Sequence, residues 1–316
     1  METNLAQSLE ITTDRAKYDD SVKELLADKQ ILARILKYTL DEFKSESIDD
    51  IINNIDEPEI SKVRVEPGHT NTTDRIRKQS EEDNVPGEGK IFFDIRFSAY
   101  AGEEQIKVLI NIEAQKSSDK NKLHYHLDNR ILYYLGRMIS SQKEVEFAKS
   151  DYDNLKAVRS IWICMDAKDD EDSINRIQFV QDTIYGKDMS LDNIDKVQGV
   201  IIRLRRNEDL SASRNELIAM LEELLKKEKL EDKKRKLAGE YGLKMNDDTE
   251  RRLNTMCNIS ELVLEEGLQQ GLQQGMQQGT IKTLIDLVKD NLLDIEIAAE
   301  RANLTVEEFK ALMEKE

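Results

Sequence analysis

Three polar residues that could support metal-dependent chemistry lie on two neighbouring apolar segments of the sequence. Asp94 belongs to the first segment, and Glu113 and Gln115 belong to the second. Two carboxylates at close range repel each other, and a divalent cation between them removes that cost. Mg²⁺ and Mn²⁺ prefer such oxygen ligands, polarise a phosphodiester and lower the pKa of their bound water. The three residues could therefore support metal-assisted hydrolysis of a phosphodiester.

Both segments alternate apolar and polar residues as β-strands do. The apolar positions are Ile91, Phe93, Ile95 and Phe97 in Lys90–Tyr100, and Ile106, Val108, Ile110, Ile112 and Ala114 in Ile106–Gln115. Ala101–Gln105 joins the two segments and has the length of a hairpin loop. The isoleucine and phenylalanine content indicates a hairpin inside a sheet, with a strand on each side.

The strand register decides whether the carboxylates meet. If Ala99 pairs with Ile106, Asp94 lies opposite Asn111. Because side chains alternate across a strand, Asp94 and Glu113 then share a face as diagonal neighbours, with Cβ atoms within ~8 Å. The same residues on the outer face of a hairpin would simply be solvated, so spacing alone leaves both interpretations open.

The segment after the second strand predicts a helix over residues 120–142. One of its faces is apolar at four-residue spacing and packs on a core. A second stripe carries His126, Arg130, Tyr133 and Arg137. Arginine could bind phosphate there and tyrosine could stack on a base. Arg130, Tyr133 and Arg137 are therefore candidate DNA contacts, with an ordinary solvated face as the alternative.

The charge of the chain bears on whether DNA is a partner. The formal net charge is −17, which argues against nucleic-acid binding because phosphates repel an acidic surface. Between Lys116 and Lys143, however, six Lys or Arg residues stand against two Asp residues. A locally basic face within an acidic protein keeps DNA open as a partner.

Other classes of protein receive no support from the sequence. Cys164 and Cys257 are far apart and lack neighbouring ligands, so neither a zinc site nor a disulfide framework is indicated. The first 15 residues have no apolar core of a signal peptide, and no apolar run is long enough to span a bilayer. We therefore expect a cytoplasmic protein without membrane contact.

The remaining pattern predicts an α/β fold with a mixed sheet, because strands stand on both sides of the packing helix. An early helix is expected at Ser21–Phe43, and later strands at Val158–Met165, Ile174–Tyr185 and Val197–Leu204. Residues 1–210 form the expected α/β domain. Residues 211–280 form a helical linker, and residues 281–316 form a small helical module.

The linker contains the repeat GLQQGLQQGMQQG, whose glycines are four residues apart and share one helical face. Glycine costs a helix about 1 kcal/mol relative to alanine, and close helix–helix contact could offset that cost. The repeat predicts either a homo-oligomer held through this helix or a weak linker helix. The module that follows is acidic, which favours a helical cap or oligomerisation module over a helix-turn-helix DNA reader.

The sequences IFFDIRFSAY, VLINIEAQKSS and NRILYYLGRMI resemble those of the PD-(D/E)XK nuclease family transposases, also called recombination-promoting nucleases. The resemblance covers residues 20–210. It implies a restriction-endonuclease-like αβββαβ core, followed here by an α-helical C-terminal tail, with Mg²⁺ dependence and DNA cleavage in recombination or transposition of mobile DNA. By the motif, Asp94 and Glu113 bind the metal, and Gln115 takes the position usually held by lysine.

The chain departs from the broad superfamily pattern. Phe93 replaces the proline before the motif aspartate, and Gln115 offers hydrogen bonds where lysine would offer charge. Lys116 is adjacent but should point to the opposite face. Further acids that could complete the site are Asp28, Glu59 and Glu81. The alternative to a nuclease is a catalytically silent DNA- or protein-binding module that keeps the fold and assembles through its tail.

Overall fold

The computed structural model describes residues 16–60, 82–85, 89–167, 169, 171–205, 211–226, 228–290 and 292–314. The chain divides by its internal contacts into two compact units, one of Arg15–Ile259 and one of Met1–Asp14 with Ser260–Glu316. Residues 211–259, predicted from the sequence as part of a helical linker, belong to the first unit. They share its hydrophobic core with the sheet.

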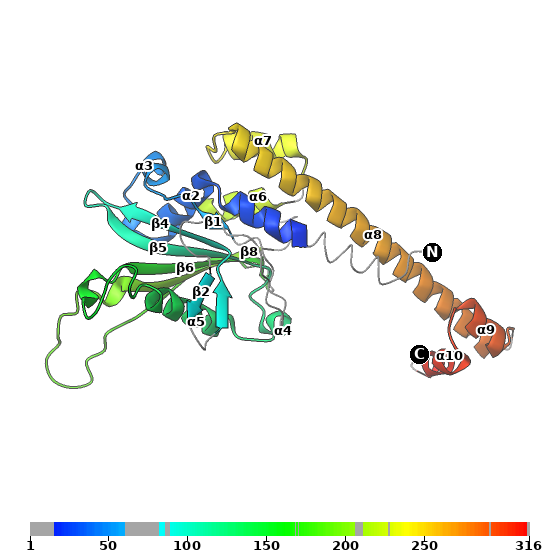
Figure 1. Cartoon of the computed structure of the whole chain (residues 1–316). Coiled ribbons are helices and arrows are strands. Elements are labelled where there is room, and N and C mark those ends of the chain that lie inside the picture. Colours follow the sequence, from blue (N-terminus) through cyan, green and yellow to red (C-terminus); the bar gives the residue numbers. More distant parts are fainter. Residues whose placement is uncertain are drawn as a thin grey trace. The chain divides into compact units, whose positions relative to one another are not determined.

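A six-stranded mixed sheet forms the centre of the first unit (Figure 1). Its strands in spatial order are β1 (Glu59–Ile60), β4 (Ile95–Ala101), β5 (Ile106–Gln115), β6 (Ala157–Ala167), β8 (Val197–Arg205) and β7 (Ser173–Gln178). Neighbours are antiparallel from β1 to β5, parallel from β5 to β8, and antiparallel between β8 and β7. The predicted α/β class with a mixed sheet is confirmed, and the β4–β5 hairpin has a strand on each side.

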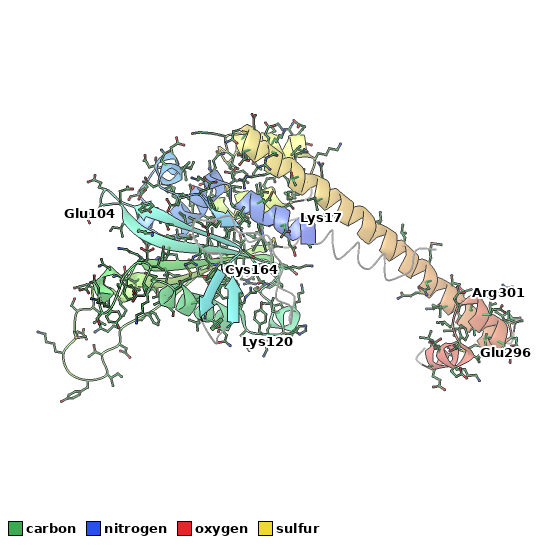
Figure 2. All side chains as sticks on the ribbon, viewed as in Figure 1. Lys17, Glu104, Lys120, Cys164, Glu296 and Arg301 are labelled. Carbon is green, nitrogen blue, oxygen red and sulfur yellow. The ribbon has the colours of Figure 1, made fainter. Side chains whose placement is uncertain are left out.

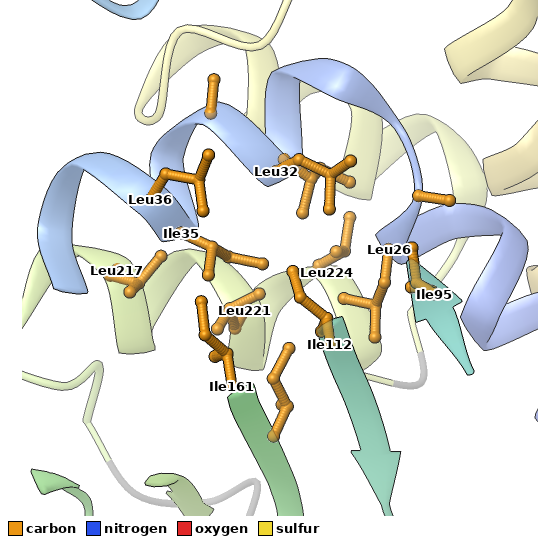
Figure 3. Close-up of a cluster of buried hydrophobic side chains, with 14 of the residues drawn as sticks. Leu26, Leu32, Ile35, Leu36, Ile95, Ile112, Ile161, Leu217, Leu221 and Leu224 are labelled. Atoms are coloured by element: carbon orange, nitrogen blue, oxygen red, sulfur yellow. The ribbon is translucent and has the colours of Figure 1, made fainter. Parts of the chain in front are cut away.

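Helices cover both faces of this sheet. The helices of this unit before α8 are residues 16–26, α2 (Lys29–Thr39), α3 (Ile48–Asn53), α4 (Lys120–Leu123), α5 (Leu127–Ser140), α6 (Glu216–Leu225) and α7 (Leu230–Gly239). Leucines of α2 and α6 bury the isoleucines of β4, β5 and β6 on one face (Figure 3). α5 packs on the other face. Because strand side chains alternate, Ile112 faces α2 and α6 while Glu113 faces α5.

Each of the two helices that the sequence predicts as continuous is divided in two. The helix expected over 21–43 spans residues 16–26 and restarts as α2, because Asp28 caps the new helix by accepting a backbone N–H of its first turn. The helix expected over 120–142 is divided into α4 and α5 by His124, whose φ of 62° is left-handed. Apolar periodicity survives such a short interruption, so the sequence pattern does not reveal it.

The first predicted strand is also interrupted. Its residues 90–92 belong to β3 (Gly89–Phe92), which pairs with β2 (Glu82–Val85) in a separate two-stranded sheet. Asp94 lies in the bend before β4, and Figure 2 shows Glu104 on the turn that joins β4 to β5. The strand expected at Ile174–Tyr185 ends at Gln178 as β7. The other two predicted strands correspond to β6 and β8.

The second unit has a small core of its own. α8 (Asp247–Lys289) contributes to both units, and α9 (Ile295–Arg301) and α10 (Val306–Met313) lie in the second. Apolar side chains that include Ile285, Ala298 and Phe309 form this core. Throughout the described part of the chain, no helix combines the length and apolarity needed to cross a bilayer.

Candidate active site

The two predicted carboxylates lie beside each other at the open end of the β4–β5 hairpin. The structure pairs Ala99 with Val108, two residues beyond the predicted partner Ile106. The predicted register is therefore wrong, but a shift of two residues keeps every side chain on its face. Extended by one residue past the pair Ile95–Ile112, this register places Asp94 beside Glu113 instead of diagonal to it.

One oxygen of each carboxylate is held by N–H donors. Asp94 Oδ2 accepts the backbone N–H of Ala114 at 3.0 Å. Glu113 Oε1 accepts the backbone N–H of Asp94 at 3.1 Å and Nδ2 of Asn111 at 2.7 Å. These bonds orient both carboxylates and leave Asp94 Oδ1 and Glu113 Oε2 for other partners.

Each of these two oxygens faces a cationic side chain. Lys23 Nζ, from the helix of residues 16–26, lies 2.7 Å from Asp94 Oδ1. Arg130 Nη2, from α5, lies 3.7 Å from Glu113 Oε2. Two helices from different parts of the sequence therefore each bring a positive charge to the carboxylate pair.

Glu113 is further oriented by a chain of buried polar side chains. Asn111 accepts a hydrogen bond from Ser160 Oγ on β6, and Ser160 accepts one from Trp162 Nε1 at 2.8 Å. Asn111 pairs with Ser160, and Glu113 with Trp162, in the parallel β5–β6 ladder. The sheet register thus builds the chain, and a fully satisfied buried network holds its members rigidly.

Arg130 is enclosed by aromatic rings. Its guanidinium carbon lies 5.1 Å from the ring centroids of Tyr134 and Trp162 and 5.8 Å from that of Tyr125. Its nitrogens donate to Gln115 Oε1 at 3.0 Å and to the hydroxyls of Tyr125 at 2.7 Å and Tyr134 at 3.0 Å. Because arginine only donates, the carbonyl of Gln115 must face it, and the amide nitrogen of Gln115 is left for another acceptor.

The electrostatics of the site favour added positive charge. Burial raises the pKa of Glu113 well above its ordinary value, and the Asp94 carboxylate raises it further. Burial lowers the pKa of Lys23, but attraction to Asp94, Asp20 and Glu113 together outweighs burial and the net shift is upward. Burial and the charge of Glu113 raise the pKa of Tyr134 to about 12, so its hydroxyl keeps its proton.

The donor set fits a divalent cation. Asp94 Oδ1 and Glu113 Oε2 are hard oxygen ligands of the kind that Mg²⁺ and Mn²⁺ prefer, and the raised pKa of Glu113 indicates that a cation would stabilise the charged pair. Within the described residues, no group of three or more His, Cys, Asp or Glu side chains could hold a metal. Water and main-chain carbonyl oxygens would have to complete the ligand shell.

The predicted DNA contacts on α5 differ in how exposed their side chains are. Tyr133 is 50% exposed and is accessible for stacking, whereas Arg137 is 3% exposed. Arg137 follows Arg130 by two helical turns and lies nearly in line with it, on the side of α5 that packs against the protein. Arg137 is therefore buried where Tyr133 is accessible, and its predicted contact with DNA stays a prediction.

The acids considered as additional ligands have different positions. Asp28 caps α2 and accepts the hydroxyl of Thr249 at 2.6 Å, so it is committed to helix packing. Glu59 lies in β1 with Arg96 as its ladder partner. Glu81 lies outside the described residues. From the helix of residues 16–26, Lys23 reaches Asp94.

Sequence reasoning missed Lys23, Ser160 and Trp162. Lys23 stands next to Val22 and close before Leu25 on a helix with an apolar face, which is a weak sign that its charge is buried for a reason. The contacts of all three residues depend on packing between segments far apart in the sequence. No local pattern could reveal those contacts.

The comparisons with known proteins return nothing for this chain. No protein-family model, no curated protein and no solved structure matches it. The geometry of Asp94, Glu113 and the residues around them therefore has to indicate the function.

Proposed function

We propose that the chain is a metal-dependent DNA endonuclease, with Mg²⁺ or Mn²⁺ as cofactor and DNA as substrate. The observation that carries the proposal is the arrangement of Asp94 and Glu113. N–H donors hold one oxygen of each carboxylate, and the other oxygen of each faces positive charge. Such an oriented pair is suited to bind a divalent cation with two oxygen ligands.

The order of the elements supports the same proposal. The chain runs through α2, β1, β4, β5, α5 and β6, with β2 and β3 as an additional hairpin between β1 and β4. β1, β4 and β5 are antiparallel, and β6 is parallel to β5. This order agrees with the αβββαβ core that the resemblance to PD-(D/E)XK nuclease family transposases implies. That resemblance suggests a role in recombination or transposition of mobile DNA.

The residues around the pair have distinct roles in this proposal. Asp94 and Glu113 would hold the cation, which polarises the phosphodiester and lowers the pKa of its bound water when bound. Arg130, fixed by its aromatic enclosure, presents positive charge to the phosphate oxygens. Gln115 directs its amide nitrogen toward a phosphate oxygen or the attacking water. Tyr133 contributes an exposed ring to the DNA-facing side of α5.

A catalytically silent DNA- or protein-binding module is the second candidate. Gln115 stands where the superfamily has lysine, and Lys23 and Arg130 already face the outward oxygens of both carboxylates. In that case the site would be a structural ion cluster, and the protein would assemble through its helical tail.

Plasmid nicking by the purified protein with Mg²⁺ separates the two candidates. Parallel reactions contain EDTA, an Asp94→Ala variant and an Asp49→Ala variant that removes an exposed acid elsewhere. The endonuclease proposal expects cleavage that EDTA and Asp94→Ala abolish and Asp49→Ala preserves. DNA binding without cleavage by the wild-type protein would favour the silent module. Cleavage that survives Asp94→Ala would mean that the active site lies elsewhere.

A further inference from the structure

Lys23, on the helix of residues 16–26, contacts the outward oxygen of Asp94. Its side chain is 13% exposed, and its Nζ lies 2.7 Å from Asp94 Oδ1. Asp94 Oδ2 is already bonded to the backbone of Ala114, so Lys23 holds the outward oxygen. This is the Asp94 oxygen that a divalent cation would need.

The charge balance of the site explains why a lysine is tolerated there. An ammonium group at this depth loses hydration, and Asp94 compensates for that loss. Glu113 and Asp20 also attract the ammonium group. In the metal-free protein, the ammonium group of Lys23 therefore offsets part of the negative charge of Asp94 and Glu113.

The two cations of the site differ in the kind of contacts that hold them. Arg130 is enclosed by three rings and donates to three side chains. The described interactions of Lys23 are with acids, through a compact charge at the end of a flexible four-carbon stem. A cation that binds Asp94 Oδ1 would displace Lys23 and leave Arg130 in place.

We propose that Lys23 is a functional residue of this site with two successive partners. Its ammonium group occupies Asp94 Oδ1 and would compete with a divalent cation for that oxygen. Released from Asp94, it would pair with a DNA phosphate and supply the mobile positive charge that Gln115 cannot supply. The inference rests on the proposed endonuclease function and adds a charge-bearing residue to it.

The competition predicts that removal of Lys23 strengthens metal binding. We expect Lys23→Met to bind Mn²⁺ roughly tenfold more tightly than the wild-type protein in the absence of DNA, since one charged hydrogen bond no longer has to be broken. Lys23→Arg keeps the charge and should stay close to the wild type. Lys244→Met is the matched control, because it removes one lysine from an exposed ion pair with Asp49. Isothermal titration calorimetry with Mn²⁺ alone measures these affinities.

The phosphate contact predicts the opposite effect on cleavage. In single-turnover reactions at Mn²⁺ concentrations that saturate every variant, Lys23→Met should cleave DNA about 10²-fold more slowly. Lys23→Arg should recover part of the rate, and Lys244→Met should match the wild type. Urea unfolding of each variant shows whether the fold is retained, and Lys23→Gln serves as a second charge-removing variant if Lys23→Met does not fold.

The combination of tighter Mn²⁺ binding and slower cleavage supports the inference. Unchanged or weaker Mn²⁺ binding by Lys23→Met overturns it, and so does tighter binding with an unchanged cleavage rate. In both cases the wild-type protein still cleaves DNA, and the endonuclease proposal stands. If neither the wild type nor Lys23→Met binds Mn²⁺, the proposed metal site itself is wrong, and the inference falls with it.

Discussion

Glu113 is an acidic residue at a buried position, and burial disfavours its charge. It is 2% exposed, and the charged form of its carboxyl group is disfavoured by burial and by Asp94. Arg130 and the N–H of Asp94 offset part of that cost. A residue of this kind decreases the stability of the metal-free protein and is retained where its charge serves a function.

The pH dependence of stability should reveal this cost. The folded-state pKa of Glu113 lies above its unfolded value, so between the two the folded protein keeps a proton that the unfolded chain has lost. The free energy of unfolding therefore falls as the pH rises through that window. Glu113→Gln, which removes the charge, should raise the free energy of unfolding, and the gain should be larger at about pH 8 than at about pH 5.

Urea unfolding in EDTA at both pH values tests this prediction. Glu104→Gln is the control, because Glu104 lies on the exposed turn between β4 and β5. A gain of equal size at both pH values would show that Glu113 does not titrate differently in the folded and unfolded states.

Asn111 should matter for both stability and metal binding. It donates to Glu113 and accepts from Ser160, and all three side chains are buried. Asn111→Ala should lower the free energy of unfolding by about 1–3 kcal/mol and weaken Mn²⁺ binding about tenfold, because polar partners lose their bonds and Glu113 loses its orientation. Urea unfolding and calorimetry measure the two effects. A loss of stability with unchanged Mn²⁺ affinity would show that Asn111 does not position the ligand.

At the scale of elements, the sequence predicts the hairpin but not its register. Alternation identifies both strands and the face that Asp94 and Glu113 share, because strand side chains have a period of two. Pairing Ala99 with Val108 or with Ile106 gives the same faces, so periodicity cannot distinguish the two registers. The length of the turn decides between them, and it follows from backbone conformation rather than from apolar pattern.

Interruptions of helices are equally hard to read from a sequence. The break at Asp28 preserves an apolar face on both sides, and only the capping hydrogen bond marks the restart. The break matters for function because α2 and the helix of residues 16–26 become separate elements. Lys23 then reaches Asp94 from the first of them. Contacts of this kind depend on the assembled layers, which explains why the sequence identified the acids but not Lys23.

Asp28 should stabilise the helix junction without contributing to the metal site. Its side chain caps α2 and accepts the hydroxyl of Thr249 in α8. Asp28→Ala should lower the free energy of unfolding by about 1–3 kcal/mol, because a cap and a buried hydrogen bond are lost. Asp28→Asn keeps one of the two acceptor oxygens and should cost less. Mn²⁺ titration should give the wild-type affinity for both variants, and a weaker affinity would make Asp28 a metal ligand.

At the scale of the whole molecule, the net charge of −17 and the proposed DNA substrate are compatible because charge is distributed unevenly. Lys23 and Arg130 lie at the carboxylate pair, on helices from different regions of the chain. Acids elsewhere, such as Asp41 with Arg176 and Glu222 with Arg205, are engaged in ion pairs away from the motif. Local charge at the site, rather than the total, should govern contact with phosphate.

The boundary between the two units predicts where the chain can be shortened. The core around the sheet includes Leu253 and Met256 of α8, whereas the second unit has its own apolar cluster. A chain of residues 15–259 keeps every buried side chain of the first core. We expect it to unfold cooperatively in urea and to bind Mn²⁺ with the affinity of the full chain.

A chain that ends at Met245 loses Leu253 and Met256, and it should lose at least about 3 kcal/mol in the free energy of unfolding. Equal stability of the two shortened chains would show that α8 is not part of the first core, and loss of Mn²⁺ binding by residues 15–259 would show that the second unit contributes to the site.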